Sequence, residues 1–220
     1  MAEGAIKMTI LETLNMTARV MTSLREVGTV GAEGGARALS EMLGQPVELC
    51  VPTVSMMPMI DLPHLYPPMD LARMCAAVYI PFSGDVEGSI ALILREHQAA
   101  GILEALGLPP GEPGGLDEMQ QSAVREIGNI VASAYLNALA NVGNMQILPA
   151  PPGLAQETVA AVLGAIAADA MQYDDYGLVM NVHMSLPDHS VTPEMLLLPR
   201  PAALAIILQK IGGWTDENAN

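Results

Sequence analysis

Hydrophobic and polar residues along the chain follow two different periods, one typical of helices and the other of strands. Where apolar residues recur about every 3.6 positions we expect amphipathic helices, and short apolar runs bounded by turn-forming residues predict strands. Helices are predicted at 9–43, 97–106, 117–141, 158–171 and 201–211. Strands are predicted at 47–51, 74–82, 86–94, 145–148, 178–186 and 191–198. The prolines after the first strand predict a long irregular loop, and they are Pro52, Pro58, Pro63, Pro67 and Pro68.

The order of these elements repeats along the chain. Residues 1–107 and 117–213 each read as helix, strand, variable segment, hairpin and helix, and the Pro/Gly-rich linker 108–116 joins them. Hairpins imply antiparallel pairing, and helices gathered on one face can cover the sheet. The sequence therefore predicts a single α+β domain over 1–220, made of two halves related by a pseudo-twofold axis. We expect an antiparallel sheet with the long helices on one of its faces.

The repeat is most specific in the long helix of each half, where residues 22–52 recur, altered, at 122–152 with a constant offset of 100 positions. The second copy holds Ser122, Glu126, Asn129 and Pro152, and the first holds Thr22, Glu26, Thr29 and Pro52 at the corresponding positions. Spacings of four and three place the first three residues of each set on one helix face. A solvated polar face is the ordinary explanation of such spacing. Its recurrence at a fixed offset favours one working site and one degenerate copy.

The residue types on this face exclude several kinds of self-contained active site. No histidine stands near Ser122 to activate it as a nucleophile, and no second carboxylate accompanies Glu126 for glycosidase chemistry. The glycines of the first long helix lack the Lys-Ser/Thr ending of a phosphate-binding loop. An asparagine amide can position a water, and a glutamate one turn away can bind a cation on a partner. We therefore interpret the face as one that completes the active site of another protein.

Charge and composition exclude several classes of binding partner and cofactor. The net charge of −15 argues against nucleic acid and anionic membranes. No run approaches the length of a membrane span, and the first fifteen residues lack the pattern of a signal peptide. Cys50 and Cys75 lie in apolar runs and are read as reduced and buried, which is consistent with a cytoplasmic protein. The four histidines have no partners at metal-ligand spacing, so no metal or other cofactor of the chain's own is expected.

The motif and its surroundings resemble a known family. Ser/Asp, three residues, Glu, two residues, Asn, twenty-two residues and Pro is the signature of the CheC/CheX/FliY phosphatases of chemotaxis, and the second copy matches it without a gap. SAVREIGNIVASAYLNALA is similar to the second conserved helix of CheC, and SLREVGTVGAEGGARALSEMLG is similar to the first. The resemblance covers nearly the whole chain and points to CheC in particular. It implies a single CheC-like domain.

The resemblance implies an activity and a role for each motif residue. In this family the helix docks on a phosphorylated CheY-type response regulator and accelerates hydrolysis of its aspartyl-phosphate. Carried over by position, Asn129 orients the attacking water, Glu126 pairs with a lysine of the partner, and Ser122 and Pro152 support them. The Mg²⁺ belongs to the response regulator. The first copy departs from the signature at Thr29, so that half is expected to be inactive or weak.

Three alternatives remain open at this point. The chain could be a non-catalytic adaptor that binds the receptor deamidase CheD or phosphorylated CheY. A flagellar switch component similar to FliY is ranked lower, because FliY carries a further C-terminal domain with no counterpart in this sequence. Glu12 and Asn15 also show the Glu-x-x-Asn spacing, but Met8 and Ala38 stand where the signature has its first residue and its proline. We interpret that pair as part of a solvated helix face.

Overall fold

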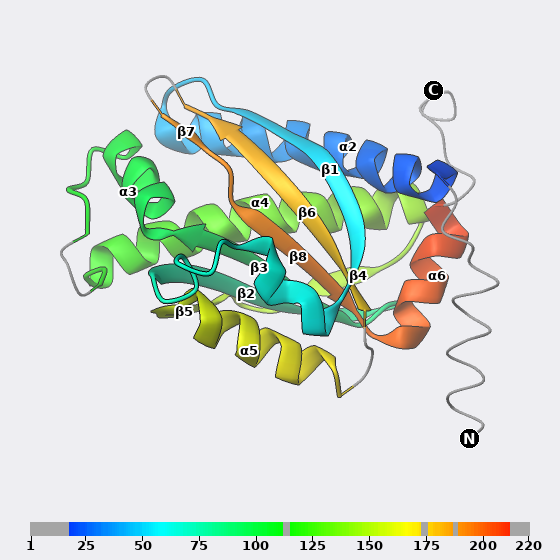
Figure 1. The fold of residues 1–220 in the computed structure, drawn as a ribbon. Coiled ribbons are helices and arrows are strands. Elements are labelled where there is room, and N and C mark those ends of the chain that lie inside the picture. The colour runs from blue at the N-terminus through cyan, green and yellow to red at the C-terminus, as the bar shows by residue number, and fades with distance from the viewer. Residues whose placement is uncertain (1–17, 112–114, 173–175, 187–188, 212–220) are drawn as a thin grey trace.

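The computed structural model describes residues 18–111, 115–172, 176–186 and 189–211 (Figure 1). The helices are α2 (Ala18–Leu43), the 3₁₀ helix η1 (Met59–Leu65), α3 (Glu96–Ala105), α4 (Glu118–Gly143), α5 (Val159–Ala170) and α6 (Pro201–Ile211). The strands are β1 (Glu48–Pro58), β2 (Met74–Gly84), β3 (Gly88–Arg95), β4 (Ile147–Pro149), β5 (Gly153–Thr158), β6 (Tyr176–Ser185), β7 (Ser190–Val191) and β8 (Glu194–Pro199). Glu12 and Asn15 lie outside the described residues.

The strands form one antiparallel sheet in the order β1-β6-β8-β3-β2-β4, with β5 also paired to β2 and β7 to β6. In this order β1 of the first half corresponds to β4 and β5 of the second, β2 corresponds to β6, and β3 corresponds to β8. Exchanging the corresponding strands gives the same order read from the opposite edge of the sheet. Each half places its first strand at the edge beside the other half's hairpin. The α+β class with pseudo-twofold symmetry is therefore confirmed. The halves share one sheet, and their exact boundaries stay a prediction.

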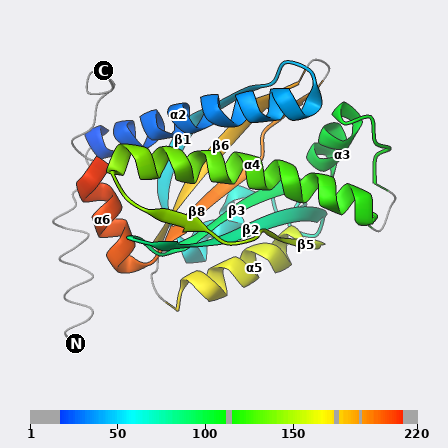
Figure 2. The ribbon, with the colours of Figure 1, turned by 180° about the vertical axis from the view of Figure 1, so that it is seen from behind.

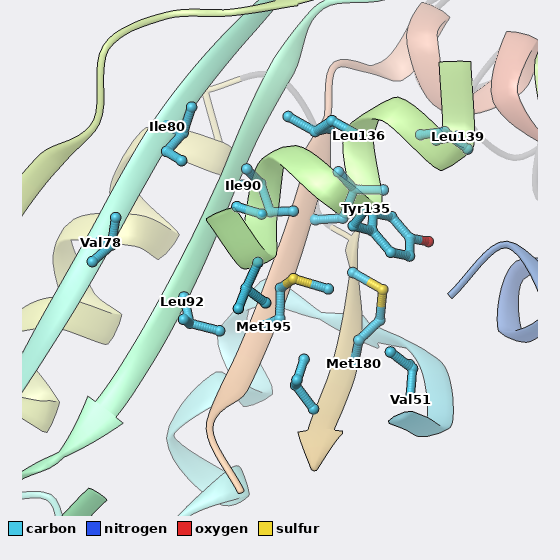
Figure 3. Packing of buried hydrophobic residues seen from close by; sticks show 14 of the residues in the cluster. Val51, Val78, Ile80, Ile90, Leu92, Tyr135, Leu136, Leu139, Met180 and Met195 are labelled. Carbon is cyan, nitrogen blue, oxygen red and sulfur yellow. The ribbon is translucent and has the colours of Figure 1, made fainter. Parts of the chain in front are cut away.

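The two long helices lie side by side on one face of the sheet and run in opposite directions (Figure 2). They approach closely at Gly31, where a Cβ atom would lie only 2.9 Å from Cα of Tyr135. Figure 3 shows Met180 and Met195 of the sheet close to Tyr135 of α4, with Val78 and Leu92 further away in the same core. Side chains alternate in direction along each strand, so every second one projects toward α2 and α4. The core on this face is the larger of the two, because both long helices pack against it.

The opposite face of the sheet is covered too, which the sequence did not predict. Val159, Leu163 and Ile166 of α5 and Met59 and Leu62 of η1 form a second buried cluster with the other set of strand side chains. The expectation that the two long helices lie on one face of the sheet is confirmed, and α5 and η1 add a cover on the other face.

Three local expectations are also corrected. The first strand does not end at Val51 but runs through Pro52 to Pro58, with a shift of register between Cys50 and Thr53. A strand that was not predicted, β5, lies beside β2. Cys50 is exposed, whereas Cys75 is buried as expected. All three differences fall on strands at the edges of the sheet, where a strand is only half covered and carries a weaker apolar signal.

Candidate functional site

Helix α4 carries the candidate site, and its first turn is fixed by reciprocal hydrogen bonds. Asp117 accepts a bond from the backbone N–H of Gln120 at 2.8 Å, and Gln120 Oε1 accepts one from the N–H of Asp117 at 2.9 Å. This capping box satisfies N–H groups that would otherwise lack partners. Val124 and Ile127 are fully buried against the sheet, so the opposite side of the helix faces solvent.

The predicted motif residues lie on or beside that solvent-facing side. Ser122 and Glu126 are exposed, and Asn129 is half-buried one turn further along. Pro152 is half-buried in the short connection between β4 and β5, and both of these strands contact α4. The structure therefore places the three helical residues on one continuous face, with the proline in the adjoining loop.

The side chain of Asn129 is held from within its own helix. Ser133 Oγ donates a hydrogen bond to Asn129 Oδ1 at 3.3 Å, and both residues are half-buried. The amide oxygen has a second lone pair, and the amide nitrogen has two hydrogens. The arrangement therefore leaves both a donor and an acceptor on this amide for a water or a partner group.

The corresponding residues of α2 are arranged differently. Thr29 Oγ1 donates to the backbone oxygen of Arg25 at 3.1 Å, so its hydroxyl is engaged on its own helix. Glu26 is half-buried, and its Oε2 atom is buried with no hydrogen-bond partner within the described part of the chain. Thr22 is exposed, as is Pro52, which lies inside β1 rather than in a loop. The two copies thus differ in how they present the glutamate and the proline, beyond the change from Asn to Thr.

A second polar cluster lies under η1 on the opposite face of the sheet, and sequence reasoning missed it. Tyr66 donates to Glu194 Oε2 at 2.9 Å, and Arg95 Nη2 lies 3.7 Å from Glu194 Oε1. Burial raises the pKa of the Glu194 carboxyl and of the Tyr66 hydroxyl, and it raises the pKa of the Cys75 thiol to about 11. These residues come from distant parts of the chain, so no local spacing could have indicated the cluster.

The described residues contain neither a metal-binding cluster nor a membrane-spanning helix. Within those ranges, no group of three or more His, Cys, Asp or Glu side chains is placed to hold a metal ion. In the same ranges, none of the helices has the length and apolar character needed to span a membrane.

Comparisons with known proteins converge on the segment that contains the motif. The family model described as the CheC-like family matches residues 119–155, which include Ser122, Glu126, Asn129 and Pro152. The chain is 29% identical over 184 residues to the CheY-P phosphatase CheC of Bacillus subtilis, covering 81% of this chain and 87% of that protein. The resemblance to the CheC-like family is confirmed.

Solved structures extend this CheC-like resemblance to the fold. Thermotoga maritima FliY superimposes with a TM-score of 0.72 at 17% identity, covering 89% of this chain and 96% of that one. The FliM middle domain from H. pylori superimposes with a TM-score of 0.60 at 15% identity, covering 88% and 99%. At these identities the likeness concerns the fold alone. FliY and the FliM middle domain carry different names yet share this architecture, so the fold alone does not define the function of this chain.

Proposed function

We propose that this chain is a phosphatase that accelerates hydrolysis of the aspartyl-phosphate of a CheY-type response regulator. The observation that carries the proposal is the α4 face, where an exposed Glu126 lies one turn from the held amide of Asn129. The similarity to a Bacillus subtilis protein named as a CheY-P phosphatase, over 81% of this chain, supports the same activity.

The proposed reaction needs little from this chain except positioning. A water attacks the phosphorus of the acyl phosphate, the bond from phosphorus to the aspartate oxygen breaks, and inorganic phosphate and a free carboxylate result. Asn129 accepts a hydrogen bond from that water and holds it in line with the breaking bond. Holding a reactant in line contributes a large part of the rate in phosphoryl transfer. The metal ion is expected on the response regulator, and no residue of this chain is assigned to bind it.

Glu126 is assigned to binding rather than to chemistry. Its side chain is exposed on α4, so its carboxylate can form an ion pair with a lysine of the docked regulator. Ser122 lies one turn before Glu126 and is assigned a supporting contact, and Pro152 shapes the loop beside the helix. The copy on α2 is assigned no catalytic role, because Thr29 has no amide and its hydroxyl is already bonded to Arg25.

A turnover assay tests this proposal against the adaptor alternative. Phosphate release from a CheY-type regulator would be followed with a small-molecule phosphodonor and a substoichiometric amount of this chain. We expect acceleration by the wild type and by Thr29→Ala, and loss of most acceleration in Asn129→Ala. A chain that binds phosphorylated CheY, or CheD, without accelerating phosphate release from any candidate regulator would be an adaptor, and the proposal would be wrong.

A further inference from the structure

We propose that Ser133 is a positioning residue for Asn129, and that its hydroxyl holds the amide in the orientation that receives the attacking water. This inference rests on the proposed function and concerns the same site. It follows from the hydrogen bond between the two side chains and from the residue that replaces Ser133 in the other copy.

The first step is the freedom that Asn129 would otherwise have. The terminal torsion of an asparagine side chain is broad, so an amide without a partner samples many orientations. Ser133 Oγ lies 3.3 Å from Asn129 Oδ1 and donates to it from one helical turn away. This bond occupies one lone pair of the oxygen and leaves the second lone pair on the amide for a water.

The second step is the length of the bond. Hydroxyl donors usually lie about 2.5–3.0 Å from their acceptors, so a bond of 3.3 Å is long. Hydrogen bonds at catalytic sites are often long in the free protein and shorten in the reacting complex. A long bond between two half-buried residues contributes little to the stability of the fold. Its removal should therefore affect the reaction more than the folded state.

The third step is the comparison between the two copies. Glu33 stands 100 positions before Ser133, and it is exposed on α2. An ionised carboxylate accepts hydrogen bonds and cannot donate one to an amide oxygen. The first copy therefore lacks both members of the pair, with Thr29 in place of Asn129 and Glu33 in place of Ser133. The degenerate copy differs from the α4 site in the positioning residue as well as in the amide.

The test uses Ser133→Ala, which removes the donor, and Ser133→Thr, which keeps a hydroxyl. Phosphate release would be measured as a function of the concentration of phosphorylated regulator, so that kcat and KM are obtained separately. We expect Ser133→Ala to lower kcat roughly two- to tenfold, the effect of one neutral hydrogen bond, with KM unchanged. Ser133→Thr should restore most of the kcat. Asn137→Ala, an exposed position one turn further along α4, serves as the matched control.

A double mutant separates positioning from a merely structural role. In the Asn129→Ala background the amide is absent, so Ser133→Ala should lower kcat no further, and thermal unfolding should confirm that each variant is folded. Wild-type kcat in Ser133→Ala, equal losses in the Ala and Thr variants, or additive losses in the double mutant would each overturn the inference. If Asn129→Ala itself keeps the wild-type kcat, the proposed role of Asn129 in catalysis is wrong, and the inference about Ser133 is wrong with it. If only Ser133→Ala keeps it, the function stands and the positioning role is wrong.

Discussion

Gly128 lets α4 lie directly on the sheet, and replacing it with alanine should disturb both stability and the site. A Cβ atom at this position would lie 2.7 Å from Cβ of Val78 and 2.6 Å from its Cγ2. Cβ of Val78 is fixed by the backbone of β2 and cannot rotate away. Ordinary contact begins at 3.4 Å, so the helix would have to move by about 0.7 Å, the difference between 3.4 and 2.7 Å.

The magnitude follows from two opposing effects. Overpacking a buried contact costs about 1–3 kcal/mol, whereas replacing glycine by alanine inside a helix stabilises it by about 1 kcal/mol. Gly128→Ala should therefore lower the free energy of unfolding by about 0–2 kcal/mol. Gly34 provides the control, because a Cβ atom there would meet nothing within 4 Å. Gly34→Ala should raise the free energy of unfolding by about 1 kcal/mol, or the Tm by about 2–4 °C.

Urea unfolding of both variants, followed by phosphate-release assays, tests this reasoning. The free energies of unfolding of the two alanine variants should differ by about 1–3 kcal/mol, the overpacking cost itself. A helix displaced by about 0.7 Å, the difference between 3.4 and 2.7 Å, would also misplace Asn129, so kcat should fall in Gly128→Ala and stay unchanged in Gly34→Ala. If Gly128→Ala were as stable as Gly34→Ala, the close contact between α4 and β2 would not exist as described.

Other predictions test the charge and thiol assignments. Burial holds the folded pKa of Glu194 above its unfolded value, so its contribution to stability is present below the unfolded value and is lost as pH rises through the folded one. Urea titrations should therefore show the wild type gaining stability relative to Glu194→Gln as pH falls from neutral toward 4.5, and a constant difference would contradict this. A thiol reagent at neutral pH should modify exposed Cys50 rapidly and Cys75, with its pKa raised to about 11, only after denaturation; equal rates would count against the burial of Cys75. Glu126→Ala should raise KM a few-fold and lower the rate, and salt should shrink the effect by screening an exposed ion pair; a KM that stays the same at every ionic strength would remove Glu126 from binding.

The fold of this chain could be predicted from sequence wherever a segment is amphipathic and well covered. Helix α4 is the best case, because Val124, Ile127 and Val131 recur at helical spacing and all three are buried. Asp117 marked its start, and it does cap the helix. Both hairpins were indicated by apolar runs separated by short turns, and most residues of their strands are buried on both faces of the sheet.

The missed elements share a physical cause. Pro52 and Pro58 signalled a break, yet proline is tolerated on an edge strand, because one side of that strand needs no hydrogen-bond partner. In the described chain β1 pairs with β6 alone. Strand β5 lies beside β2 with its residues alternating between exposed and half-buried, so its sequence carries little apolar signal.

The candidate site was predictable in its face but not in its detail. Spacings of four and three sufficed to place Ser122, Glu126 and Asn129 together on α4. The bond from Ser133 to Asn129 depends on side-chain rotamers, and the half-buried carboxylate of Glu26 depends on how α2 packs. The contact between Tyr66 and Glu194 joins residues 128 positions apart, so no local pattern could indicate it.

The most direct test of the central claim is the single-turnover rate of phosphate loss from a phosphorylated CheY-type regulator with this chain at saturating concentration. The account predicts a rate constant well above that of the regulator alone. In Asn129→Ala the acceleration should fall on the order of a hundredfold, or about 2.7 kcal/mol in the barrier, while the variant still binds the regulator. Equal rate constants for the wild type and Asn129→Ala would contradict the claim that the amide on α4 performs the catalysis.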